Sequence, residues 1–166
     1  MDQETLQDLF IDQLKDLYNA ENQLTKALPK MAKASSDPNL AQAFTDHLEE
    51  TKGHVQRLEQ IFEELGESPK GKTCKAMEGL IAEGKEQMEE DAEPEVMDAG
   101  LIAAAQRVEH YEMAGYGCVR AYAKALGHGA ALKLLQETLE EEGAADKKLT
   151  RLADGIINIK AQAKHA

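Results

Sequence analysis

Residues 66–94, which read GESPKGKTCKAMEGLIAEGKEQMEEDAEP, decide the fold of this chain. They begin with a turn-forming segment, 66–71, that contains Pro69 and Gly71, and continue as an amphipathic helix at about 73–90. This stretch separates two long helical patterns from two others. A bundle whose helices simply alternate in direction needs short loops, and about 30 residues between its second and third helices are too many. The stretch therefore predicts a long crossover that carries a short helix of its own.

Long amphipathic helices precede and follow this crossover. Apolar residues recur at three- and four-residue spacing almost everywhere, and no stretch alternates as strands do. The predicted long helices are at about 3–34, 37–65, 94–126 and 129–159. Two helical hairpins joined by a long crossover define a ferritin-like four-helix bundle, so we expect an all-α chain with a single domain over 1–166. A helical repeat array is disfavoured, because only two hairpins are present.

Local signals indicate where these helices begin and end. Ser36, Asp37 and Pro38 supply a cap and a first-turn proline for the second long helix. Pro29 is expected to kink the last turns of the first helix, because a proline in a helix removes a hydrogen bond. Residues 160–166 are expected to fray, as chain ends commonly do.

Composition excludes several classes of protein. Of the 166 residues, 31 are acidic and 19 are basic, so the formal net charge is −12. This balance argues against partners such as nucleic acids, which need basic patches, and against adsorption to anionic membranes. The longest apolar runs, such as 100–105, are too short to span a bilayer, and residues 1–4 lack the apolar core of a signal peptide. Cys74 and Cys118 are the only cysteines, which fits a reducing cytoplasm.

Carboxylates interrupt the apolar seams of the long helices, that is, the rows of apolar residues that each helix turns towards the core. The residues concerned are Glu21 in the first helix, Glu112 in the third, Glu142 and Asp146 in the fourth, and Glu50 with His54 beside the seam of the second. All six lie 14–18 residues from the centre of their turn, roughly 21–27 Å along a helix, so they can form one layer. The hairpins also repeat, because 91 residues separate Glu21 from Glu112 and 92 separate Glu50 from Glu142.

A layer of carboxylates and imidazoles inside a bundle is typical of a metal site. An isolated charge in a dry core is so costly that it must be neutralised, paired or bound to metal. A single seam carboxylate is more often a solvated edge residue, but the matched heights favour a dinuclear iron or manganese centre. The predicted ligands are Glu21, Glu50, His54, Glu112, Glu142 and Asp146, with Glu109 as a further ligand, an outer support or a solvated flank.

The spacing departs from the usual di-iron pattern, which has Glu-x-x-His on two helices. Gly53 follows Glu50 at the third position, so His54, at the fourth, would have to serve instead. Two other side chains admit both a functional and a packing role. His47, one turn before Glu50, could support a ligand from outside the site. The Tyr116 hydroxyl could bond a ligating carboxylate or act as a one-electron donor, although seam aromatics more often fill the core.

Several long segments of the chain are also familiar. The chain resembles the YciE/YciF family of ferritin-like bacterial stress proteins over nearly its whole length, and it is closest to the YciF branch. The segments that carry the resemblance are residues 17–24, 47–51, 74–81, 99–105, 108–112 and 137–142. The resemblance implies a cytoplasmic, homodimeric, ferritin-like protein with a di-iron-type site. It does not supply a defined reaction.

Two classes of function remain open from the sequence. In the first, the chain is a metal-dependent redox protein that binds Fe(II), reacts with oxygen or peroxide, and takes electrons from an external donor. In the second, the metal site is degenerate, and the chain is a non-catalytic structural or interaction protein that binds an unknown protein partner. Neither class assigns a catalytic residue. The metal content of the protein separates the two.

Overall fold

Helices account for almost all of the described chain. Within residues 4–163, which this computed structural model describes, the elements are α1 (Leu6–Ala34), α2 (Pro38–Leu65), α3 (Lys75–Glu89), α4 (Pro94–Leu126), α5 (Gly129–Leu152), a π-helical turn η1 (Ala153–Ile157) and α6 (Asn158–Ala163). The expected start of the first helix, at about residue 3, lies outside the described residues. The largest difference between the expected and observed elements is at the C-terminal end, where residues 160–163 are helical although fraying was expected. Residues 164–166 lie outside the described part.

The first two helices begin at side chains that cap them. The Thr5 hydroxyl accepts a hydrogen bond from the Asp8 N–H at 3.1 Å, and the Asp8 carboxylate accepts one from the Thr5 N–H at 2.9 Å. Asp37 caps α2 by accepting the Asn39 N–H at 2.9 Å, and Pro38 occupies the first turn, as predicted. Pro29 lies within α1, which continues to Ala34.

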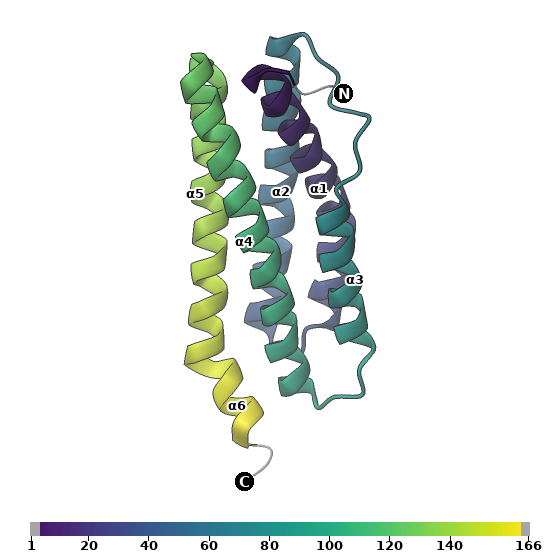
Figure 1. Cartoon of the computed structure of the whole chain (residues 1–166). Coiled ribbons are helices and arrows are strands. Elements are labelled where there is room, and N and C mark those ends of the chain that lie inside the picture. Colours follow the sequence, from purple (N-terminus) through teal and green to yellow (C-terminus); the bar gives the residue numbers. More distant parts are fainter. Residues whose placement is uncertain (1–3, 164–166) are drawn as a thin grey trace.

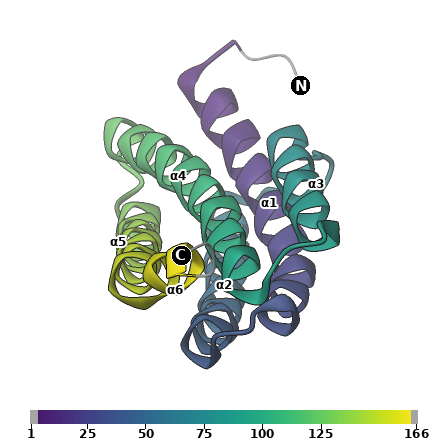
Figure 2. The same cartoon turned by 90° about the horizontal axis from the view of Figure 1, so that it is seen from below.

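The four long helices pair as two hairpins, α1 with α2 and α4 with α5 (Figure 1). The hairpins pack together through α1 against α4 and α2 against α5, and the crossover helix α3 lies on α1 and α4 (Figure 2). No strand occurs among the described residues. The prediction of an all-α ferritin-like bundle with a helical crossover is therefore confirmed. None of the described helices is long and apolar enough to cross a membrane.

Hydrogen bonds to α1 hold the crossover in place. The backbone N–H of Cys74, at the start of α3, donates to the Asn19 Oδ1 at 2.8 Å. The Gln23 Nε2 donates to the Cys74 carbonyl at 3.2 Å, and the Cys74 side chain is fully buried. The Cys74 Sγ also lies 3.0 Å from the Tyr111 hydroxyl of α4. The start of α3 is therefore tied to both helices that it covers.

Asp98 connects α4 to the turn between α1 and α2. Its side chain is buried, and its two oxygens accept the backbone N–H groups of Ser36 at 2.7 Å and Asp37 at 2.8 Å. Because a hydrogen bond to a charged group contributes about 1.5–3 kcal/mol, we expect Asp98→Ala to lower the free energy of unfolding by about 3 kcal/mol. Urea denaturation measures this change. Asp91→Ala, at an exposed carboxylate in the loop before α4, is the control and should leave the stability unchanged.

The apolar core is divided into two clusters. One surrounds Leu24, Phe44 and Leu101, and the other surrounds Phe10, Phe62 and Val119. Along each long helix, the residues between the two clusters include buried charged side chains. The middle of the bundle is therefore a polar layer between two apolar ones.

The π-helical turn keeps the end of the last long helix on the core. Leu149, Ala153 and Ile157 are all buried, and they follow one another at intervals of four residues. In an α-helix, which has 3.6 residues per turn, residues at intervals of four shift gradually around the helix. In a π turn, the backbone hydrogen bonds join residues five apart instead of four, and the wider turn keeps this row on one face. The chain after Ile157 then continues as α6, which packs against α4.

Candidate metal centre

The polar layer consists of six buried ionisable side chains from four helices. They are Glu21 of α1, His47 and His54 of α2, Glu109 and Glu112 of α4, and Glu142 of α5. The helical repeat explains why each pair on one helix faces the same way, since seven residues separate the two histidines and three separate the two glutamates. Four of the six are completely inaccessible to solvent, and the most exposed, His47, is only 6% exposed.

These side chains form two groups that share one carboxylate. His47, Glu109, Glu112 and Glu142 each place a ligand atom within 4.8 Å of the others, and so do Glu21, His54 and Glu142. The Glu142 Oε2 lies 3.6 Å from the His47 Nε2, and its Oε1 lies 3.0 Å from the His54 Nδ1. The two oxygens of Glu142 therefore face different histidines, as a bridge between two cations requires.

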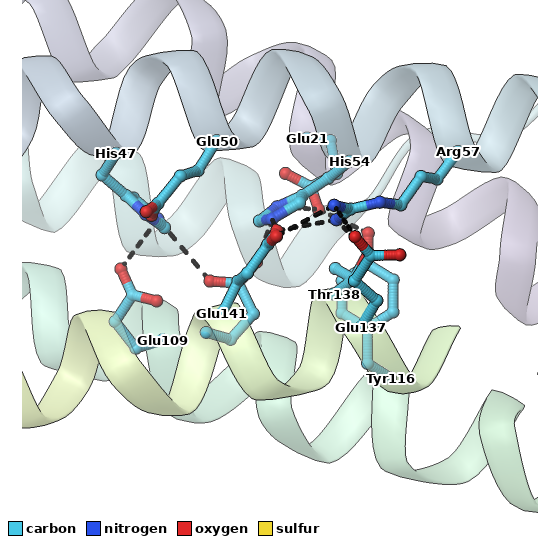
Figure 3. Close-up of polar contacts among 11 residues, drawn as sticks. Glu21, His47, Glu50, His54, Arg57, Glu109, Tyr116, Glu137, Thr138 and Glu141 are labelled. Atoms are coloured by element: carbon cyan, nitrogen blue, oxygen red, sulfur yellow. Dashed lines mark hydrogen bonds and ion pairs between the residues drawn. The ribbon is translucent and has the colours of Figure 1, made fainter. Parts of the chain in front are cut away.

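Each histidine has a second carboxylate on its outer side (Figure 3). The His47 Nδ1 lies 3.1 Å from the Glu50 Oε2, and the His54 Nε2 lies 2.8 Å from the Glu141 Oε2. If these ring nitrogens carry the protons, the inner nitrogens of both rings present lone pairs to the layer. An outer carboxylate of this kind fixes the tautomer and orientation of a metal-binding imidazole.

Arg57 and Tyr116 hold the outer parts of the layer. The Arg57 guanidinium donates to both oxygens of Glu141, at 2.6 and 2.9 Å, and thereby fixes the carboxylate that contacts His54 (Figure 3). The buried Tyr116 hydroxyl donates to the Glu21 Oε1, and its ring meets the His54 ring edge-on with centroids 6.3 Å apart. This is the carboxylate contact that sequence analysis considered for Tyr116.

Many polar atoms in the layer lack a hydrogen-bond partner among the described residues. They are the Glu21 Oε2, His47 Nε2, Thr51 Oγ1, His54 Nδ1, Glu109 Oε2 and both carboxylate oxygens of Glu112 and Glu142. The His47 Nε2 is 3.1 Å from the Glu109 Oε1, yet the two are not aligned for a hydrogen bond. Unsatisfied buried polar groups are rare and costly, so their concentration in one layer fits cation ligands.

Comparison with known proteins identifies the family. The family model described as "Domain of unknown function (DUF892)" matches residues 5–162. This chain belongs to the DUF892 family. Protein YciF of Escherichia coli K12 is 52% identical to this DUF892 chain over 165 residues, which is 99% of each chain. The resemblance to the YciE/YciF family is thereby confirmed.

Solved structures share the fold of this DUF892 chain. The crystal structure of the E. coli stress protein YciF has a TM-score of 0.90 at 52% identity and covers 93% of this chain and 98% of its own. YcfI of Rhodopseudomonas palustris has a TM-score of 0.87 at 46% identity, over 90% and 95% of the two chains. A Xanthomonas campestris protein shares the fold at 16% identity, with a TM-score of 0.77 over 98% and 100% of the chains.

The ionisable groups of the DUF892 chain are strongly coupled. Burial, and the charges of Glu142 and Glu21, raise the pKa of Glu112 well above its usual range. Burial also raises the pKa of Glu142, to about 8, although its contact with His54 opposes the rise. Burial alone would lower the pKa of His54, but Glu142 and Glu21 raise it to about 10. In the absence of metal, the layer therefore holds protons that bound cations would displace.

The DUF892 chain places two of the predicted ligands outside both groups. The Glu50 side chain is 46% exposed, and its Oε2 lies 3.1 Å from the outer nitrogen, Nδ1, of His47. The Asp146 Oδ1 faces α4, where it accepts from the Gln106 Nε2 at 3.1 Å and lies 3.4 Å from the His110 Nε2. The expectation that these two join the others in one layer needs correction, because each lies a fraction of a turn off the buried face.

The other predicted positions do come together in the DUF892 chain. Glu21, His54, Glu112 and Glu142 are brought into the layer, and Glu109, one of whose expected roles was a solvated flank, is buried with them. His47, considered as an outer support, lies inside instead. Its position could have been found from the sequence, because His47, Thr51 and His54 follow one another at the three- and four-residue spacing of one helix face.

Proposed function

We propose that this protein binds two divalent cations, iron or manganese, in the polar layer, with Glu142 as the carboxylate between them. His47, Glu109 and Glu112 would complete one site, and Glu21 and His54 the other. The observation that carries the proposal is the concentration of unpartnered buried atoms in two groups that share Glu142. Four carboxylates facing one another in an apolar core need compensating positive charge, which two divalent cations supply.

The donor set determines which metals fit. Carboxylate oxygens and imidazole nitrogens suit iron and manganese, and neither group contains a cysteine that would favour zinc or copper. The set of four glutamates and two histidines also has the composition of di-iron carboxylate sites in ferritin-like bundles. The pattern here distributes these residues differently, because both histidines lie on α2 and two glutamates lie on α4.

We propose oxidation of Fe(II) by oxygen or peroxide as the activity. Adjacent iron or manganese ions would supply the one-electron steps. The protein would hold the ligands in place, with Glu50 and Glu141 fixing the imidazole tautomers, and the two apolar clusters would keep bulk water out. An external electron donor would complete turnover. A role in stress, a cytoplasmic location and the homodimer implied by the family resemblance belong to the same proposal.

Metal content tests the proposal with matched variants. Protein loaded with Mn(II) or with anaerobic Fe(II) should retain two ions per chain in elemental analysis. His47→Ala and Glu142→Gln should lose at least one of them, because each removes a ligand. His110→Ala and Asp146→Asn are the controls, since they alter a histidine and a carboxylate near the layer but outside both groups. Both controls should retain two ions.

Two results would contradict this assignment. Full metal content in Glu142→Gln would show that Glu142 is not the bridge. A parent protein that binds neither metal would favour the alternative, a structural or interaction protein with a degenerate site. Oxygen consumption on addition of Fe(II) then tests the activity of a metal-binding protein.

A further inference from the structure

A small pocket opens on the side of the bundle between α2 and α5. It has a volume of about 60 Å³ and reaches from the surface to His47 and Glu109. Ala144 and Ala145 of α5 form part of its wall. Because these side chains are single methyl groups, the two helices leave an opening here. It leads directly to one of the two ligand groups.

The polar residues of the pocket are of two kinds, half-exposed ones at its mouth and buried ones at its inner end. At the rim, the Lys148 Nζ pairs with the Asp46 Oδ2 at 3.0 Å, and both side chains are almost half exposed. Glu50 is exposed to the same extent as this pair, and its Oε2 lies 3.1 Å from the His47 Nδ1. At the inner end, the buried His47 Nε2 and Glu109 Oε2 have no hydrogen-bond partner among the described residues.

The larger groove on the other side of the bundle has a different chemistry. It has a volume of about 270 Å³ and lies between α1, α3 and α4. Apolar side chains such as Leu24, Met31 and Val108 line it, its charged side chains are lysines, and no carboxylate lines it. A hydrated cation would therefore meet no ligand there. Of the cavities along the described chain that approach the layer, the pocket at Glu50 is the one suited to a cation.

We propose that divalent cations enter and leave the buried layer through the pocket between α2 and α5, with Glu50 as the carboxylate that contacts His47 along this route. The ion pair of Asp46 and Lys148 acts as a gate at its mouth. The proposal rests on the proposed metal binding and adds the route by which the ions exchange. It also gives Glu50 a role outside both ligand groups, as the carboxylate that passes a cation from solvent to His47.

Exchange kinetics with Co(II) test this route. Uptake by the metal-free protein is followed by stopped flow with a metal-indicator dye, and release is followed after addition of excess chelator. Ala145→Leu narrows the pocket without touching a ligand. It should slow uptake and release by the same factor, about tenfold, and leave the Kd unchanged, because a barrier alters both rates equally. Ala125→Leu, at an exposed position of α4, is the control for added bulk.

The gate is tested with a charge variant in the same assay. Lys148→Ala removes a cation from the mouth, so uptake of Co(II) should become about threefold faster at low ionic strength, with the difference lost at high salt. Lys147→Ala removes the same charge from the adjacent exposed position, which does not line the pocket. It should leave uptake close to that of the parent.

Distinct results would overturn the route and the metal site. If the parent binds Co(II) and Ala145→Leu exchanges it at the parent's rates, ions do not pass through this pocket. Equal effects of Lys148→Ala and Lys147→Ala would likewise overturn the gate. If the parent binds no Co(II), Mn(II) or Fe(II) at equilibrium, the proposed function fails, and the route fails with it.

Discussion

Addition of Mn(II) or anaerobic Fe(II) to the metal-free protein should raise its melting temperature by about 10 °C for each site filled. A cation that binds only the folded state, at about 1,000 times its Kd, stabilises that state by about 4 kcal/mol. For a chain of this size, each kcal/mol corresponds to about 2–4 °C. Thermal denaturation followed by circular dichroism measures the shift, and Ca(II), which prefers more oxygen ligands, is the control.

The shift should be larger at pH 7.5 than at pH 5.5. Burial raises the pKa of Glu142 to about 8, and Glu142 and Glu21 outweigh burial to raise that of His54 to about 10. Between their unfolded and folded pKa values, both groups bind more protons in the folded state. The stability of the metal-free protein should therefore fall as pH rises through this range. Protons also compete with metal for these atoms, so equal shifts at both pH values would contradict the proposed ligands.

Glu142→Leu should stabilise the metal-free protein and abolish its response to metal. Glu142 is completely buried and is repelled by Glu109 and Glu21, although it contacts His54. Without metal, Glu142 either repels these carboxylates or takes up a proton in an apolar core, as its raised pKa of about 8 indicates, and His54 keeps Glu21 and Glu141 as partners when Glu142 is removed. An apolar side chain of similar size removes this cost, and we expect a gain of about 2 kcal/mol. The melting temperature should then rise by about 5 °C.

A matched variant separates this effect from a general gain in apolar character. Glu140→Leu makes the same substitution two residues earlier on α5, where the side chain is exposed. Its melting temperature should stay near that of the parent, and it should keep the response to Mn(II). If instead Glu142→Leu is less stable than the parent and still responds to metal, Glu142 does not bridge two cations.

The fold could be predicted from the sequence because its signals are redundant. The caps at Asp37 and Gly66, the long crossover and the periodic seams all indicate the same arrangement, and each long helix shows its apolar face over several turns. The π turn after Leu152 could not be predicted in this way. In the sequence, the π turn is marked only by a row of apolar residues at intervals of four. The apolar face of an ordinary α-helix also contains such intervals, so the row does not identify a π turn.

The sequence predicts at which level along the bundle the site residues lie, but not in which direction around their helices the side chains point. Counting residues from each turn places Glu21, Glu112 and Glu142 at one level, and the structure brings them together. The same count does not show which face of its helix a residue occupies. Asp146, four residues after Glu142, is rotated by about 40° and meets α4 from outside the layer. Similarly, Glu50 precedes the buried Thr51 by one residue and points partly to solvent.

The π turn of Ala153–Ile157 also determines which changes in chain length this end of the protein tolerates. A π turn is an α-helix with one residue too many, so deletion of Gly155 restores an uninterrupted α-helix. The five residues of a π turn sweep about the same angle as four residues of an α-helix, about 400°, so the chain after the deletion keeps its orientation. Ile157 would stay on the core, and Lys160 would keep its 3.3 Å contact with Asp37. Relatives of this chain that lack one residue here can therefore build the contact between α6 and α4 from the same side chains.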